Sequence, residues 1–374
     1  MGQNPTTNWR HFDFWLLGAV ALLVIFGIPM IRSAIAGNIA SAGADQNQLI
    51  FAVIGFVAVL VTASIDYHLW ASISRGLYIG TAVVLAGLYL VGDALFGSAR
   101  WFSVGPILIQ PSEIAKIVLI LVLADFFTRY QNRMDEPQWI LRSLLMTMGI
   151  VVWVLLQPNL STVILMLVLW FSLLWAAGLR IKHLLIFGGG GLITAAASFP
   201  LLVRFEIIKA YQLQRITNFI FPDPNATHGE AYNIQQALIS IGSGGLFGQG
   251  YGHGSQVQLR FLKVRWSDFI FSAMAQEFGF IGTVLIMLIL LFVIYRILRI
   301  AHMSRDTFGA LIAYGVAAML AFQTIVNIGV NLKMLPATGL TLPFISYGGS
   351  SLLSSLIGIG LVESVILRHK TLEF

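Results

Sequence analysis

One carboxylate, Asp268, stands where acid–base chemistry would be expected. Lys263 and Arg265 come shortly before it, and a long polar segment gives way to an apolar one at this point. Cationic neighbours would keep such a carboxylate ionised, as a general base requires. Aspartate is also a common helix N-cap that accepts hydrogen bonds from free backbone N–H groups. On position alone, the cap is favoured over catalysis.

A second carboxylate, Glu277, cannot share this chemistry. It lies further along the same apolar segment, and the spacing corresponds to about 900° of helical rotation and about 13.5 Å of rise. The two side chains would therefore face opposite ways, unlike the paired carboxylates of glycosidases. Acid–base chemistry would rest on Asp268 alone.

Another charged pair, Glu113 and Lys116, lies early in an apolar segment that follows Gln110-Pro111. Proline suits the first position of a helix, and Glu113 falls where a capping-box glutamate reaches back to the helix start. Lys116 shares a helix face with Glu113 and lies a full turn inside the apolar segment, where ionisable residues pair or line a cavity. We expect a Glu113–Lys116 pair facing a polar cavity, and leave a structural and a substrate-facing role equally open.

Further cations accompany irregular backbone. The segment 204–267, with Arg215, holds more cations than carboxylates, which indicates either solvated charge or an anion site. Arg100-Trp101 either pairs a cation with an interfacial aromatic or is an ordinary belt tryptophan. The stretch that leads to Ser346 contains prolines and close glycines, and irregular backbone at membrane depth is tolerated only where protein buries it or it lines a cavity. We therefore expect the stretch that leads to Ser346 to form the wall of a cavity.

The elements that position these residues are membrane-spanning helices. The chain is 57% hydrophobic and 10% charged, against about 45–50% and about 25% in soluble domains. A span needs about 20 mostly apolar residues. The sequence predicts an all-α polytopic membrane protein in one domain (1–374) with ten spans, near 12–32, 48–65, 76–93, 112–130, 138–156, 160–178, 182–203, 268–299, 307–331 and 346–367.

Charge gives the orientation. With a cytoplasmic N-terminus, the inner loops collect arginine and lysine, as the positive-inside rule requires. The net charge of +6 reflects this topology, and nucleic-acid binding is not indicated. The large loop 204–267, between the seventh and eighth spans, then lies outside with every candidate site residue. Within it, 232–241 has apolar residues at helical spacing and would lie on the membrane surface or cap the bundle.

The sequence contains no cysteine, which excludes a disulfide frame, a thiolate metal site and a cysteine nucleophile.

A set of short segments, in this order, resembles the SEDS (shape, elongation, division and sporulation) family of RodA and FtsW membrane proteins over nearly the whole chain. The matching pieces are Arg100-Trp101, Gln110-Pro111-Ser112-Glu113-Ile114-Ala115-Lys116, Gln157-Pro158, Tyr211 with Arg215-Ile216, Gly242-Ser243-Gly244-Gly245-Leu246, Gly254-Ser255-Gln256, Ser267-Asp268-Phe269-Ile270-Phe271 and Pro343-Phe344-Ile345-Ser346-Tyr347-Gly348-Gly349-Ser350.

The resemblance implies a peptidoglycan glycosyltransferase that polymerises lipid II on the outer face of the bacterial cytoplasmic membrane. It implies an essential aspartate matching Asp268, and a class B penicillin-binding protein as partner. The short N-terminus is more similar to RodA, which implies cell elongation, cell shape and other elongation-complex membrane proteins as partners. We expect substrate contacts from Arg100, Trp101, Glu113, Lys116, Arg215, Lys263, Arg265 and Ser346, and a divalent cation (Mg or Mn) as a candidate cofactor.

The chain departs from the family pattern at several positions. Asn159 replaces the usual aspartate after Gln-Pro, so Lys116 must rely on Glu113 or another partner. Lys263 and Val264 replace a Pro-Glu pair, Ser267 replaces threonine, and Gln276 stands where glutamate is common.

Three other functions stay open at this stage. The chain could be an FtsW-like division polymerase, a transporter (flippase) of lipid II, or a scaffold that recruits a wall enzyme. Intramembrane Glu113 and Lys116 would suit a transporter, although internal repeats and a midplane site are not evident.

Overall fold

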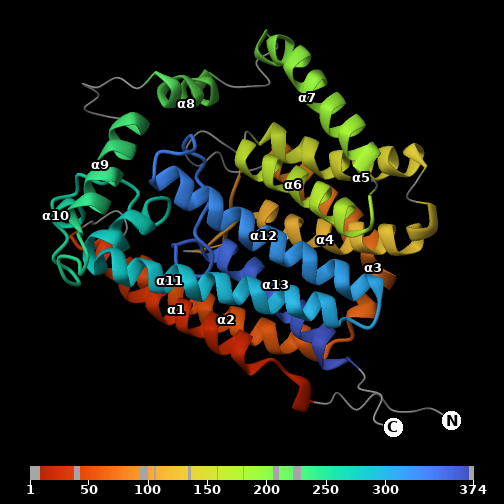
Figure 1. The fold of residues 1–374 in the computed structure, drawn as a ribbon, viewed down its shortest axis with the longest axis horizontal. Helices are drawn as coiled ribbons and strands as arrows, with labels where there is room; N and C mark the ends of the chain where they lie inside the picture. Colours follow the sequence, from red (N-terminus) through yellow and green to blue (C-terminus); the bar gives the residue numbers. More distant parts are fainter. Residues whose placement is uncertain are drawn as a thin grey trace.

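The computed structural model of the chain describes residues 9–37, 43–91, 100–104, 107–133, 136–157, 159–179, 181–204, 210–221 and 229–369. These residues form a bundle of long helices, with three shorter helices between 210 and 258 at one end of it (Figure 1). The long helices are α1 (Phe14–Ile35), α2 (Ala44–Ser64), α3 (Tyr67–Val91), α4 (Pro111–Arg129), α5 (Pro137–Leu156), α6 (Leu160–Ala176), α7 (Ile181–Arg204), α11 (Ile270–Met303), α12 (Thr307–Asn331) and α13 (Gly349–Leu367).

The smaller elements are η1 (Trp9–His11), η4 (Gln131–Arg133), α8 (Ala210–Ile220), α9 (Gly229–Ser243), α10 (Ser255–Gln258), β1 (Phe102–Val104) and β2 (Ile107–Ile109). The two strands pair antiparallel, with Phe102 opposite Ile109. The predicted all-α class holds, with this hairpin of two three-residue strands as a local addition that the sequence did not predict. It fills the connection that leads into α4.

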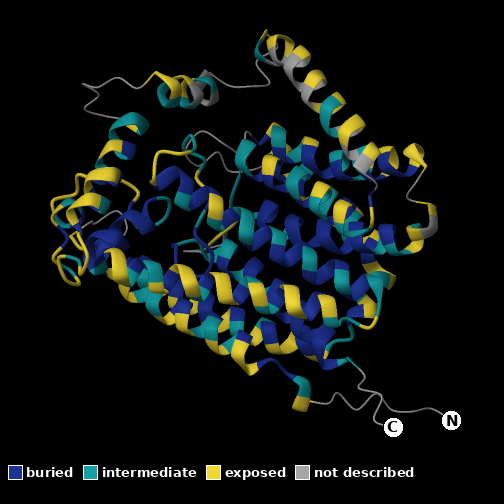
Figure 2. Ribbon diagram, viewed as in Figure 1, coloured by how far each residue is buried: buried dark blue, intermediate teal, exposed yellow. Residues whose placement is uncertain are grey.

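Seven of the described helices are long and apolar enough to cross a membrane, namely α1, α2, α3, α5, α11, α12 and α13, and α6 is a shorter apolar helix. This confirms a polytopic membrane protein. On the outside of the bundle, apolar side chains such as Val53, Val83 and Leu285 are exposed, and Figure 2 shows exposed stripes along the peripheral helices. Apolar residues exposed along these stripes are suited to contact lipid.

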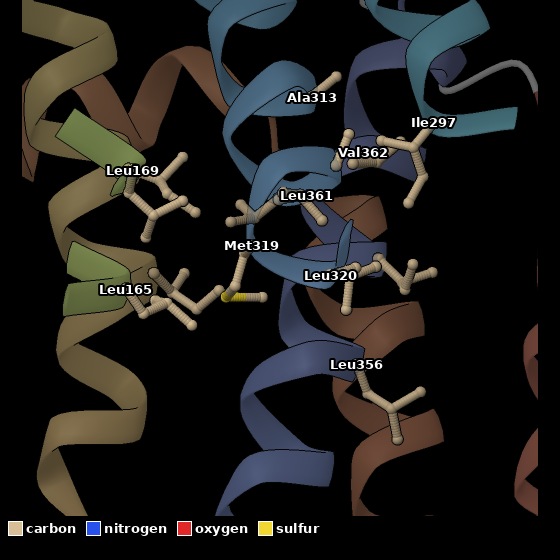
Figure 3. Packing of buried hydrophobic residues seen from close by; sticks show 14 of the residues in the cluster. Leu165, Leu169, Ile297, Ala313, Met319, Leu320, Leu356, Leu361 and Val362 are labelled. Carbon is tan, nitrogen blue, oxygen red and sulfur yellow. The ribbon is translucent and has the colours of Figure 1, made fainter. Parts of the chain in front are cut away.

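α4 is less apolar because it carries Glu113, Lys116 and Asp125, yet nearly all of its side chains are buried. Its central place explains why it tolerates charges that a lipid-facing helix could not. Leucine, isoleucine and methionine side chains from α6, α12 and α13 pack beside it (Figure 3). The helices approach closely where glycine allows it: a Cβ at Gly315 of α12 would lie 2.6 Å from Ile120.

The two ends of the chain meet at one end of the bundle. The backbone N–H of Asp13, before α1, donates to the Glu363 carboxylate of α13 at 3.0 Å. Arg296 of α11 binds Asp13 at 2.6 Å. α8, α9 and α10 lie at the other end (Figure 1). The predicted helix within 232–241 belongs to α9, whose Ile234 and Ala237 pack on α12 and the final loop, so it caps the bundle.

α11 is broken at Gly279, which has φ 67° and ψ −169°. The glycine-rich loop after α9 supplies the hydrogen bonds that the break releases, as half-broken helices at membrane depth require. The bonds run from Gln249 and Gly250 N–H to the carbonyls of Gln276 and Glu277, and from Phe280 and Ile281 N–H to those of Gly245 and Leu246, at 2.9–3.1 Å. The loop is therefore part of the helix packing.

Candidate functional site

Asp268 does not cap α11. The helix begins at Ile270 and Phe269 is its N-cap residue. The side chain of Phe269 makes no hydrogen bond to the free backbone N–H groups at the helix start. Instead Asn331, at the end of α12, accepts hydrogen bonds from the backbone N–H of Ser272 at 3.1 Å and from its hydroxyl at 2.6 Å. The cap reading of Asp268 is wrong, because a neighbouring helix satisfies the free donor.

The backbone of Asp268 is held by the same helix. Its carbonyl accepts from the side-chain amides of Asn331 at 2.9 Å and of Asn327 at 3.1 Å. Asn327 also donates to the carbonyl of Leu340 at 2.8 Å, which ties the final loop to α12. Both asparagines are buried, and the sequence analysis missed them. Two amides four residues apart at the end of an apolar span were the available signal.

The carboxylate of Asp268 has little around it by contrast. It is half-buried and, among the residues that the structure describes, accepts one hydrogen bond, from the Ser267 hydroxyl at 2.9 Å. Gly339, with φ 75°, lies against its other oxygen, since a Cβ there would stand 3.7 Å away. A side chain at this position would touch the carboxylate at ordinary van der Waals distance, so it is the left-handed backbone that favours glycine here.

The final loop, 332–348, lies beside Asp268 and is bonded to the backbone next to it. The Ser346 hydroxyl donates to the carbonyl of Ser267 at 2.7 Å and accepts from the N–H of Leu342 at 2.9 Å. Gln48 of α2 binds the same loop through the carbonyl of Ser346 at 3.1 Å. Ser346 therefore fixes the backbone next to Asp268, a positioning task, and its hydroxyl is already fully used.

Burial raises the pKa of Asp268 and is the largest influence on it, while the Ser267 hydrogen bond and Arg215 act in the opposite direction. That cationic neighbours keep Asp268 ionised stays a prediction. Arg215 lies in an ion pair with Glu230 at 2.7 Å and donates to the carbonyl of Ala337 at 3.4 Å. Burial also raises the pKa of Glu230, with a further contribution from Asp268. The three groups share one electrostatic environment.

The two cations closest in sequence face elsewhere. Lys263 is exposed. Arg265 is only 2% exposed, donates to the carbonyl of Leu262 at 3.3 Å and lies 5.9 Å from the ring of Trp266. Burial, and then Arg260, lower the pKa of Arg265. Its guanidinium has no ion pair with any carboxylate of the described ranges.

The predicted Glu113–Lys116 pair is confirmed, with Nζ 2.6 Å from Oε2 and side-chain exposures of 8% and 1%. The capping-box reading of Glu113 is wrong, because the backbone N–H of Gln110 at the start of α4 donates to the Ser350 hydroxyl at 2.9 Å instead. Ser354 of α13 donates to Glu113 at 3.4 Å. With both charges enclosed, the geometry favours the structural role over substrate contact.

Within the described part of the chain, no group of three or more histidine, aspartate or glutamate side chains could hold a metal ion. The residues present around Asp268 thus do not fit a resident divalent cation. No step below is routed through one.

Comparisons with known proteins agree with this geometry. Residues 11–371 match the model of the FtsW/RodA/SpoVE family, described as "Cell cycle protein". The chain belongs to this family, known as SEDS. It is 33% identical to the "Probable peptidoglycan glycosyltransferase FtsW" of Geobacter sp. (strain M18), over 96% of this chain and 98% of the relative. It is 34% identical to the "Stage V sporulation protein E" of Bacillus subtilis (strain 168), over 96% and 98%.

Two solved structures match the SEDS fold seen here. The first belongs to work on "structural coordination of polymerization and crosslinking by a peptidoglycan synthase complex" and has a TM-score of 0.78 at 28% identity, covering 95% of this chain and 97% of that chain. The second is the rod shape determining protein RodA of Thermus thermophilus, with a TM-score of 0.71 at 29% identity and coverage of 97% and 99%.

One SEDS feature is altered in this chain. Asn159, where the family pattern has aspartate, caps α6 through a hydrogen bond from the Thr162 N–H at 3.4 Å. Arg100 donates to the carbonyl of Gln157, directly before this cap, at 3.0 Å, and Trp101 is half-buried. Pro158 lies outside the described residues. Arg100 thus fixes the α5–α6 connection.

Proposed function

We propose that this SEDS protein polymerises lipid II into glycan strands on the outer face of the bacterial cytoplasmic membrane. The observation that carries the proposal is the Asp268 carboxylate, which is positioned rigidly by its backbone yet left with one hydrogen bond. A carboxylate in this state is available to take a proton. Family membership and the names of the relatives support glycosyltransferase activity.

In the proposed mechanism Asp268 accepts the proton of the acceptor sugar's 4-hydroxyl. That oxygen attacks the anomeric carbon of the donor, and undecaprenyl diphosphate leaves from the opposite face, so the linkage inverts. A pKa raised by burial suits this task, because a base works best when its pKa approaches the working pH. Arg100, Arg215, Lys263 and Arg265 are the cations proposed to stabilise the diphosphate.

The proposed topology has ten spans in one domain, with 204–267 as a large outer loop. The seven apolar helices are supplemented by α4, α6 and α7, which are of spanning length or nearly so. The start of α1 and the end of α13 are in contact through Asp13 and Glu363, which requires an even number of crossings. A reporter fused within 210–221 should read as external, and one within 131–133 as cytoplasmic; the opposite result contradicts the site assignment.

We further propose a class B penicillin-binding protein as partner. A structural neighbour comes from a complex that couples polymerisation with crosslinking. The elongation role is supported by the RodA structural neighbour, whereas named relatives are FtsW proteins. A division role is therefore the second candidate. Complementation of conditional elongation and division mutants separates the two: rescue of rod shape supports the first, rescue of septation the second.

The decisive test is glycan synthesis from labelled lipid II by the purified chain, with and without its partner. Polymer from parent protein and none from Asp268→Asn is expected. Movement of lipid II across proteoliposome membranes without polymer formation would replace the proposal by the transporter function.

A further inference from the structure

We propose that Arg265 is the residue that receives a phosphate oxygen of the polyprenyl diphosphate, and that the turn carrying it couples this binding to Asp268. The inference rests on the proposed function and assigns one of its four cations a specific task. It follows from two unusual features of the turn 260–265.

The first feature is a guanidinium with unused donors. Nη1 of Arg265 donates to the Leu262 carbonyl, but Nε and Nη2 are buried and have no hydrogen-bond partner among the residues that the structure describes. A buried charge without a partner destabilises the folded protein, and a bound anion would offset that unfavourable free energy. The planar fork of arginine suits phosphate oxygens.

The other three cations are already engaged or solvated. Arg215 is paired with Glu230, Arg100 donates to Gln157, and Lys263 is exposed. Arg260, which lowers the pKa of Arg265, donates to the carbonyl of Gly37 and adds positive charge to the same turn. An incoming anion therefore meets two guanidinium groups, and Arg265 is the one with unused hydrogen-bond donors.

The second feature is strained backbone. Arg260 and Val264 have φ of 62° and 51°, and a β-branched residue is a true outlier in the left-handed region. Such strain is found where a segment rearranges in function. Since Arg265 is only 2% exposed, a ligand must displace the exposed residues of this turn, and the strain makes the closed turn easier to open.

The turn is connected directly to the proposed base. The carbonyl of Val264 accepts from the N–H groups of Ser267 at 3.2 Å and of Phe269 at 3.4 Å, one on each side of Asp268. A change at Val264 on diphosphate binding therefore moves the backbone that carries the carboxylate. The base would reach its working position when the donor substrate is present.

The test measures binding of undecaprenyl diphosphate to the full chain in phosphatidylcholine nanodiscs, by native mass spectrometry, without turnover. Arg265→Gln should weaken binding at least tenfold and Arg265→Lys by an intermediate factor, because the charge stays and the fork is lost. The matched control Arg260→Gln removes the same charge from the same turn but no hydrogen-bond donor that faces the ligand, so it should weaken binding clearly less than Arg265→Gln does. Equal losses in both glutamine variants, or no loss in Arg265→Gln, would overturn the proposal.

Two further readouts keep the result interpretable. Arg265→Gln should unfold at the same or a higher temperature than the parent, because an unpaired buried charge has been removed; a clear decrease would show a structural role and overturn the assignment. Replacing phosphatidylcholine by phosphatidylglycerol should leave diphosphate binding in place. If phosphatidylglycerol abolishes diphosphate binding by the parent, Arg265 binds phospholipid headgroups and the proposal is overturned. Polymerisation by the parent is measured separately, so a failure here is distinguishable from a failure of the proposed function.

Discussion

Replacing Asp268 by asparagine and Asn331 by alanine should have opposite consequences. Asp268→Asn exchanges one charge-assisted hydrogen bond from Ser267, worth about 1.5–3 kcal/mol, for a neutral one worth about 0.5–1.5 kcal/mol. Removal of a desolvated charge offsets this loss. We expect stability within about 1 kcal/mol of the parent, and polymerisation reduced on the order of 10²–10⁴-fold because an amide cannot act as base.

Asn331→Ala removes the acceptor of the Ser272 N–H and hydroxyl and one donor to the Asp268 carbonyl. Loss of an N-cap costs about 0.5–2 kcal/mol, and each buried polar group left unsatisfied costs about 1–3 kcal/mol. A destabilisation of about 2–4 kcal/mol is therefore expected, while the carboxylate itself is retained.

The assay combines glycan formation from labelled lipid II with thermal unfolding of both variants in one detergent. Asp268→Asn should lose activity and keep its melting temperature, whereas Asn331→Ala should melt earlier and keep part of its activity. Parental polymerisation by Asp268→Asn would remove Asp268 as the base. If Asp268→Asn instead melts as early as Asn331→Ala, the carboxylate is structural and the assignment of capping to Asn331 fails.

Three more measurements test other parts of the site. Burial raises the folded-state pKa of Asp268, so ionisation of its carboxylate destabilises the folded protein as pH rises through that pKa. At a pH above this pKa, Asp268→Asn should be more stable than the parent, and the difference should disappear near the unfolded-state pKa of about 3.9. Parental polymerisation should fall as acid protonates the base. Lys116→Ala, which leaves buried Glu113 unpaired, should destabilise by about 3–5 kcal/mol, and parental stability would contradict an enclosed pair. Gly248→Ala should expose the glycine-rich loop to protease, since its Cβ would lie 2.2 Å from a backbone carbonyl of α11, whereas Gly242→Ala meets no atom within 4 Å and serves as control; equal cleavage would refute loop docking.

The sequence was sufficient for the membrane class and the family. These follow from composition and from short motifs whose order is distinctive. It was also sufficient for the Glu113–Lys116 pair, because two opposite charges one turn apart on an apolar helix have few other solutions. Enclosure of the pair by α13 was not predictable, since the distance along the chain to Ser354 carries no local signal.

The role of Asp268 at the helix end was misjudged for a related reason. N-cap preference is a local rule, and at this position it favoured Asp268. The donor is satisfied instead by Asn331, from a helix that follows much later. The electrostatic prediction also used nearness along the chain: Lys263 and Arg265 are near Asp268 in sequence, but Lys263 is exposed and Arg265 donates to the carbonyl of Leu262. Nearness along a turn does not give nearness of charges.

The start of α11 therefore divides two tasks that one aspartate often combines. Asn331 and Asn327 satisfy the helix end and hold the Asp268 carbonyl, so the backbone position does not depend on the carboxylate. A carboxylate that caps a helix is held in its charged form by the N–H groups it accepts from, which lowers its pKa and weakens it as a base. Because Asp268 does not cap the helix, burial is the largest influence on its pKa, and its Oδ2 lies toward Gly339 while Oδ1 accepts from Ser267. The two asparagines thus make the proposed base both well positioned and reactive.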